Sequence, residues 1–296
     1  MRYFILVLLF LASTVFAQPV RIVIQYQAGG VSDRMARTVQ MALENNGIPT
    51  TVEYKLGAGG FIAYNYVGNL RTNETVIVVA SNGLTDGIGT SNLIEYTLSD
   101  FVVVKHLGNV PSMMVVSSSH PAKSFKQLLE ISQTKPITYG TAGVGTGTHI
   151  AGAIVGAHDK HFTDIPYKGT APALVDVLSG QVDFIMEAET ILDPYLKTGK
   201  LRPLAVMSPT RLSTYPDVPT LAELGVNDYG YTRWSVIVAN KTADPETIKR
   251  IQKAVSQPEF IAKLSEFGQR PVKTVPNQLE ELHNRFQKIR QRVKLD

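Results

Sequence analysis

The chain has 296 residues, no cysteine, a net charge of +4 and a hydrophobic content of 44%. The lack of cysteine excludes a disulfide-stapled scaffold, so stability must come from burial, for which the apolar content is ample. Lysine and arginine are scattered except in the C-terminal KIRQRVK, so the small positive charge favours solubility and does not predict nucleic-acid binding.

The first 17 residues, MRYFILVLLFLASTVFA, have the pattern of a secretory signal peptide. Arg2 supplies a positive start, an apolar stretch follows over residues 3–11, and small residues precede Gln18. A membrane anchor would need about 20 apolar residues in a row, and polar residues interrupt this run at positions 13, 14 and 18. We therefore expect cleavage after Ala17 and a periplasmic location.

Strand-like and helix-like segments alternate along the rest of the chain. Apolar, β-branched runs predict strands at VRIVIQY (20–26), TTVEY (50–54), TVIVVAS (75–81), FVVVKHL (101–107), MMVVSSS (113–119), PITYGTAG (136–143), QVDFIME (181–187), LRPLAVMS (201–208) and WSVIVAN (234–240), with an edge or strand end at DIPYKG (164–169). Helices are predicted at 32–45, after GAGG, from Ser124, at 148–157, 170–178 and 190–199, and from Asp244 onward.

This alternation favours an α/β fold with mostly parallel sheets flanked by helices. About nine strands are too many for one sheet and suit two, so we expect two lobes. The chain is predicted to cross between them near 117–122 (SSSHPA) and 228–234 (DYGYTRW). The first lobe would then be discontinuous, with residues 18–119 and 233–296, and the second would contain residues 120–232.

Three segments share one order of residues: a β-run, then glycines with a small hydroxyl residue, then a helix. They are YQAGGVSD (26–33), YKLGAGGFIA (54–63) and YGTAGVGTGTHIAG (139–152). Ligands of open parallel sheets bind beyond the carboxyl ends of the strands, where helix starts offer unpaired N–H groups and a positive dipole end. A lone turn of this kind usually only makes a corner. Three together predict that main-chain N–H groups and nearby hydroxyls receive an acidic group.

No nucleotide or catalytic motif is recognisable. The third turn departs from the dinucleotide pattern because Thr148 occupies its last glycine position, and neither GxxxxGK[ST] nor G-x-S-x-G occurs. His158 and His161 have a metal-like spacing without an apparent third ligand. Asp33 fits a helix cap that contacts its own turn better than a base. We expect no catalytic residue, no metal and no cofactor.

Glu187 and Glu189 end a β-run that would face the space between the lobes. Such a pair can be an acid/base couple, a seat for an amine on the ligand, or solvated charges at a strand end. An exported α/β enzyme of the hydrolase type, acting on a small acidic substrate, is therefore the alternative to a binding protein. It would need a base such as Asp33 or Glu187 beside a nucleophile, and the sequence shows no such nucleophile.

Nearly the whole mature chain resembles the extracytoplasmic solute receptors of the tripartite tricarboxylate transporter system, the Bug receptor family. AGGVSDRMAR is similar to the family pattern A-G-G-x-x-D-x-x-A-R, and further matches are GAGG, YGTAGVGTGTHIAG, IPYKGTAPALVDVLSGQVDF and GKLRPLAVMSPTRLSTYPDVPTLAELG. The resemblance implies a monomeric, two-lobed Venus-flytrap protein of the periplasm that hands a small carboxylate to a membrane transporter. A role in sensing, without a transporter, is a third possibility.

The resemblance also implies which residues bind the ligand. The first two turns would hold one carboxylate, partly through ordered waters, and the second lobe would close on it. The expected contacts are Tyr26, Ala28, Gly29, Gly30, Ser32 and Asp33, then Ala58, Gly59, Gly60, Phe61 and Ser81, and finally Thr141, Thr146, Thr148 and Glu187. Tyr26 stands where the family usually has phenylalanine.

Phe61 replaces the family's usual asparagine and favours either a ligand with an apolar or aromatic body or simple core packing. Dicarboxylates, tricarboxylates, acidic amino acids and aromatic acids all fit such a site.

Overall fold

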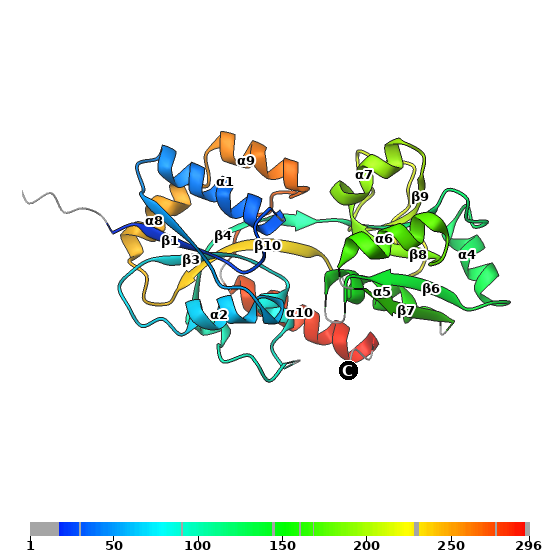
Figure 1. Ribbon diagram of the computed structural model, residues 1–296, viewed down its shortest axis with the longest axis horizontal. Helices are drawn as coiled ribbons and strands as arrows, with labels where there is room; N and C mark the ends of the chain where they lie inside the picture. The colour runs from blue at the N-terminus through cyan, green and yellow to red at the C-terminus, as the bar shows by residue number, and fades with distance from the viewer. Residues whose placement is uncertain are drawn as a thin grey trace, which may run out of the picture.

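A computed structural model describes residues 18–29, 31–89, 91–143, 146–159, 161–167, 169–227, 231–275 and 277–293. The predicted signal peptide, residues 1–17, lies outside the described residues, as does Gly30. Within the described ranges the strands form two sheets of five strands each, and no helix has the length and apolar character needed to span a bilayer. The two sheets form the two lobes seen at the left and right of Figure 1.

The first sheet has the strand order β2-β1-β3-β10-β4. Its strands are β1 (Val20–Ile24), β2 (Thr50–Tyr54), β3 (Val76–Ser81), β4 (Phe101–Val110) and β10 (Arg233–Asn240). β1 is parallel to β2 and β3, and β10 is antiparallel to both of its neighbours. The valine and isoleucine run of β3 is buried on both faces, as expected for a strand covered by helices on each side.

Helices cover both faces of this sheet (Figure 1). One face packs against α1 (Val31–Asn45), α8 (Pro245–Ala254) and α9 (Pro258–Leu264). The other face packs against α2 (Phe61–Gly68) and α3 (Gly83–Asp86). Short 3-10 turns lie at Ala58–Gly60, Leu98–Asp100 and Ser265–Phe267.

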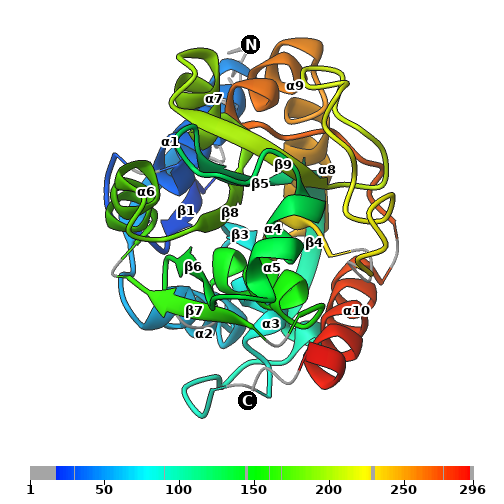
Figure 2. The same ribbon diagram turned by 90° about the vertical axis from the view of Figure 1, so that its right-hand side faces the viewer.

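The second sheet has the strand order β7-β6-β8-β5-β9. Its strands are β5 (Ser112–Ser117), β6 (Ile137–Thr141), β7 (Phe162–Pro166), β8 (Phe184–Ala188) and β9 (Leu201–Met207). Figure 2 views this lobe from its free end, with α4 (Phe125–Ser132) and α5 (Gly147–Gly156) on one face and α6 (Thr170–Ser179) and α7 (Glu189–Lys197) on the other. β5 is antiparallel to β8 and β9.

Local signals set the helix ends. The Ser124 hydroxyl accepts from the N–H of Gln127 at 3.2 Å and caps α4. Asp244 accepts from the N–H of Thr247 at 2.8 Å and caps α8, which has Pro245 in its first turn. Each cap satisfies one of the four N–H groups that a helix start leaves unpaired.

The chain crosses from the first sheet to the second at Pro111, which differs from the predicted crossing near 117–122. β5 already belongs to the second sheet. The prediction was wrong by one strand because FVVVKHL and MMVVSSS are both apolar, and hydrophobicity does not reveal which sheet receives a strand. The return crossing precedes Arg233, where β10 begins, and residues 228–230 of the predicted second crossing lie outside the described residues.

The C-terminal helix α10 (Gln278–Val293) belongs to both lobes and not to the first lobe alone. Leu279 and Leu282 are buried in the core that covers β3 and β10, whereas Phe286 and Ile289 are buried in the core under α4 and α5. In Figure 1 this red helix runs below the crossing strands. It is a third connection between the lobes, made by packing instead of by the chain itself.

Replacing Phe286 with alanine tests this connection. The ring is 5% exposed, so we expect Phe286→Ala to lower the free energy of unfolding by about 3 kcal/mol, the cost of a large cavity. Lys288→Ala, on the exposed side of the same helix, is expected to change it by less than about 0.5 kcal/mol. Urea unfolding followed by circular dichroism measures both; equal effects would contradict a stabilising contribution from the burial of Phe286.

Candidate functional site

Asp33 organises the first glycine-rich turn from the start of α1. Its Oδ2 accepts a hydrogen bond of 2.8 Å from the N–H of Gly29, and its Oδ1 accepts one of 2.7 Å from the Tyr54 hydroxyl. The Gly29 N–H and then the Tyr54 hydroxyl hold the pKa of Asp33 below its usual value, although burial opposes them. Both carboxylate oxygens are thus engaged in holding the turn.

The second turn presents its main chain. Gly57, Ala58, Gly59 and Gly60 all have positive φ, with Ala58 at 48°. This region is unfavourable for a residue with a Cβ, and such strain is typically kept at ligand-binding loops. The Tyr26 hydroxyl donates to the carbonyl of Gly59 at 3.0 Å and ties the first turn to the second. The N–H groups of Ala58 and Gly59 have no acceptor among the described residues, which leaves both for a ligand.

Residues at the end of β3 form hydrogen bonds with α2, which follows the second turn, and with the segment that begins β10. Ser81 is the last residue of β3, and its N–H donates to the Tyr64 hydroxyl at 3.4 Å. The next side chain, Asn82, donates to the carbonyl of Thr232 at 3.1 Å and accepts from the N–H of Trp234 at 2.9 Å. The segment that follows β3 is therefore tied to the start of β10 by two hydrogen bonds.

In the third turn the predicted threonines bind one another and the turn itself. Thr148 Oγ1 accepts from the N–H of Ala142 at 2.7 Å and lies 2.9 Å from Thr146 Oγ1, which donates to the carbonyl of Gly143 at 2.6 Å. Thr141 Oγ1 accepts from the N–H of Gly143 at 3.4 Å. These hydroxyls fix the shape of the turn at the start of α5.

Glu187 ends β8 and is 1% exposed. It accepts hydrogen bonds of 2.6 Å from the Thr170 hydroxyl, at the start of α6, and from the N–H of Ala188. It also forms an ion pair with Arg233, the first residue of β10. Arg233 lies across the start of α5, since a Cβ built on Gly147 would stand 3.0 Å from its Cδ.

Glu189 is also engaged by an arginine. Arg270, whose main chain pairs with Asn109 of β4, donates to Glu189 at 2.8 Å, and the Thr214 hydroxyl binds the other oxygen. Neither glutamate is a solvated strand-end charge, one of the three interpretations that the sequence left open.

The structure joins the predicted site residues through a chain of contacts. The second turn lies beside the end of β3, since a Cβ on Gly83 would stand 3.6 Å from the carbonyl of Gly59. Asn82, which follows β3, is hydrogen-bonded to Trp234 of β10. Arg233 of the same strand lies against the start of α5 and is paired with Glu187. Phe61 instead packs over Gly87, where a Cβ would meet its ring at 2.5 Å. This is the core-packing role.

Sequence reasoning missed Asn82, Thr170 and Arg233. Their partners lie on distant segments, so no local pattern marks them. The available signal was an arginine beside the chain's one tryptophan at the predicted second crossing. Over the described residues, no group of three His, Asp or Glu side chains is placed to hold a metal ion.

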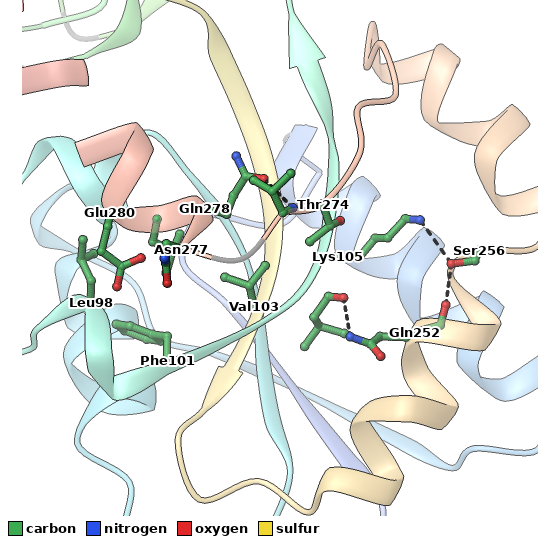
Figure 3. Close-up of a pocket in the computed structure, with 13 residues that line it drawn as sticks. Leu98, Phe101, Val103, Lys105, Gln252, Ser256, Thr274, Asn277, Gln278 and Glu280 are labelled. Atoms are coloured by element: carbon green, nitrogen blue, oxygen red, sulfur yellow. Dashed lines mark hydrogen bonds between the residues drawn. The ribbon is translucent and has the colours of Figure 1, made fainter. Parts of the chain in front are cut away.

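A cavity of about 580 Å³ lies elsewhere, on the first lobe. Figure 3 shows it between β4, α8 and the start of α10, with Lys105, Gln252 and Gln278 among its lining residues. Lys105 Nζ donates to Ser256 at 3.2 Å, and Gln252 donates to the carbonyl of Val104 at 3.1 Å. Its lining comes from the first lobe and α10 and includes none of the three turns.

Comparisons with known proteins agree with this two-lobed architecture. Protein BugT of Bordetella pertussis is 28% identical over 278 residues, which cover 90% of this chain and 85% of that protein. The solved structure of R. palustris Rpa4515 with adipate is 25% identical, has a TM-score of 0.80 and covers 93% of this chain and 97% of that one. The periplasmic binding protein BugD, at 24% identity, shares the fold with a TM-score of 0.77, covering 94% and 98%.

A family model extends the match to most of the chain. The model described as the tripartite tricarboxylate transporter family receptor matches residues 35–294, which include most of α1, the second and third turns, both crossings and α10. The chain therefore belongs to the tripartite tricarboxylate transporter receptor family, the Bug receptors.

Proposed function

We propose that this protein is a periplasmic solute receptor that captures a small carboxylate between its two lobes and delivers it to a tripartite tricarboxylate-type membrane transporter. The observation that carries the proposal is the set of glycine-rich turns at the facing ends of the two sheets. The second and third turns present main-chain N–H groups without an acceptor among the described residues, at helix starts where hydrogen bonds and the helix dipole stabilise an anion. The family membership supports the same function.

Binding by main-chain N–H groups accounts for how an acid is held in the first lobe, because Lys55, the one lysine or arginine in the first two turns, is paired with Glu53 at 2.6 Å. Ala58 and Gly59 offer N–H groups that nothing else in the described chain uses. The carboxylate of Asp33 stabilises the neighbouring first turn by accepting hydrogen bonds from the Gly29 N–H and the Tyr54 hydroxyl. The solved relative that holds adipate supports a carboxylate as the ligand class.

Hinge closure follows from the connections between the lobes. A ligand that contacts the turns of both lobes favours the closed state by the difference between its affinities for the closed and open states. Two strands and α10 join the lobes, so closure requires rotation about Pro111 and the start of β10 together with a shift of α10. We propose that the receptor acts as a monomer and is not an enzyme.

The hydrolase alternative is less favoured because the bases that it would need are occupied. Asp33 accepts from Gly29 and Tyr54, and Glu187 accepts from Thr170, Ala188 and Arg233. Each carboxylate would have to give up these bonds before it took a proton from a substrate. We also propose export through the signal peptide, with cleavage after Ala17.

A ligand screen tests the proposed function. Protein covering residues 18–296 is refolded from denaturant, which removes any ligand carried through purification, and its melting is followed with a panel of carboxylates and their neutral amides. A true ligand at a hundred times its dissociation constant is expected to stabilise the fold by about 2.7 kcal/mol. The acid must be recovered unchanged. No shift with any acid, or conversion of one, would contradict a receptor.

Asp33→Ala tests the organisation of the first turn. Loss of the bonds to Gly29 and Tyr54 should release the turn and weaken binding of the ligand found in the screen about tenfold, the low end for charged hydrogen bonds. The matched control is Arg37→Gln, which removes a half-exposed partner 3.6 Å from Asp33 and should leave affinity within about threefold. Isothermal titration calorimetry measures both; unchanged affinity in Asp33→Ala would remove Asp33 from the site.

A further inference from the structure

Glu187 and Arg233 form a buried ion pair at the second-lobe side of the site. Glu187 is 1% exposed, and its carboxylate already accepts from the Thr170 hydroxyl, the N–H of Ala188 and the guanidinium of Arg233. An ammonium group on a ligand could reach this carboxylate only by displacing bonds that the chain itself supplies. Glu187 is therefore poorly suited to bind an amine of the ligand, because its carboxylate is already paired with the cation Arg233.

Arg233 stands where three helices begin. It enters from β10, which belongs to the first sheet, and its side chain lies across Gly147 at the start of α5. Its partner Glu187 lies two residues before the start of α7 and accepts from Thr170 at the start of α6. These three helices follow the carboxyl ends of β6, β7 and β8, the edge of an α/β sheet where ligands bind.

Most N–H donors of Arg233 have no acceptor among the described residues. An arginine has five N–H donors, and among the described residues Arg233 donates to Glu187 alone. Its side chain is 23% exposed, so the remaining edge is accessible to a ligand. The N–H groups of Gly147 and Thr148 beside it likewise have no acceptor within the described chain.

The local charge favours an anion on that free edge. Glu187 balances one positive charge, and its two oxygens also accept from Thr170 and from the N–H of Ala188. The starts of α5, α6 and α7 add positive dipole ends, and a carboxylate can bind a guanidinium through two parallel hydrogen bonds. A side chain at position 147 would crowd Arg233, because a Cβ there would stand 3.0 Å from the Cδ of the arginine.

We propose that Arg233 binds one carboxylate of a ligand that has two acid groups and no amine, while the first-lobe turns bind the other. Glu187 acts as a positioning residue that holds the guanidinium at the start of α5. This inference rests on the proposed function and narrows its ligand class to amine-free dicarboxylates. It makes Arg233 the residue that distinguishes a diacid from a monoacid.

Calorimetric titrations with matched probes test the assignment. Succinate, glutarate and adipate are each compared with the corresponding half-amide, which keeps the length and removes one charge. Arg233→Gln is expected to weaken the best diacid about thirtyfold, within the range for hydrogen bonds between charged groups, and to leave its half-amide within about threefold. As a result, the preference for diacid over half-amide should nearly disappear.

Two further variants separate recognition from folding. The double variant Arg233→Gln with Glu187→Gln removes the whole pair, leaves no unpaired buried charge, and should lose the same diacid preference. Arg270→Gln is the matched control, since it breaks the other arginine–glutamate pair between the lobes, at 2.8 Å. It should bind diacid and half-amide as the wild type does. Melting curves confirm that each variant is folded.

Each outcome decides the question. Loss of the diacid preference in both Arg233 variants supports the assignment. Wild-type diacid affinity in these variants, or an equal loss for diacid and half-amide, overturns it. A wild-type protein that binds only monoacids or amino acids overturns the dicarboxylate class and leaves the proposed receptor function intact. A wild-type protein that binds no acid in the wider screen overturns the receptor function as well.

Discussion

The pairing of β10 with β3 and β4 is the constraint on which the site depends. β10 enters the first sheet antiparallel to both neighbours directly after the chain returns from the second lobe. Its first residues therefore lie between the lobes, and they carry bonds in both directions. Asn82 binds the main chain at Thr232 and Trp234 from the first lobe, whereas Arg233 reaches Glu187 in the second lobe. The start of this strand is thus bonded to both lobes.

In the proposed site, main-chain N–H groups bind the ligand in the first lobe and a side chain binds it in the second. The first-lobe turns present N–H groups from a strained, glycine-rich backbone, with Asp33 and Tyr26 holding the turns in place. The second lobe adds helix starts and Arg233, whose charge is oriented by a buried carboxylate. Backbone N–H groups can donate to many different acids, so in our proposal the oriented guanidinium supplies the selectivity among them.

Much of the fold could be predicted from the sequence because the signals are local. The strand TTVEY was placed at its observed bounds, and the cap at Ser124 lies where the sequence predicts it. Local signals fail where the outcome depends on distant partners. The segment MMVVSSS reads as a strand but not as a member of the second sheet. Likewise α10 shows an amphipathic pattern without showing that its two ends are buried in different lobes.

The candidate site follows the same division. The three turns carry their signal in consecutive residues, but the role of Glu187 depends on Arg233, which lies 46 residues away. Phe61 is the opposite case, since its place in the second turn allows either a ligand contact or core packing, and the structure shows its ring packed over Gly87. Whether a side chain near a turn serves ligand or core is decided by packing that sequence order does not reveal.

The most direct test of the account is a distance measurement between the lobes. The chain has no cysteine, so Met41→Cys on α1 and Val175→Cys on α6, both 61% exposed, can carry two spin labels. We predict that the label-to-label distance shortens when the carboxylate identified by the screen is added and not when its neutral amide is added. An unchanged distance with bound carboxylate would contradict capture by closure between the lobes.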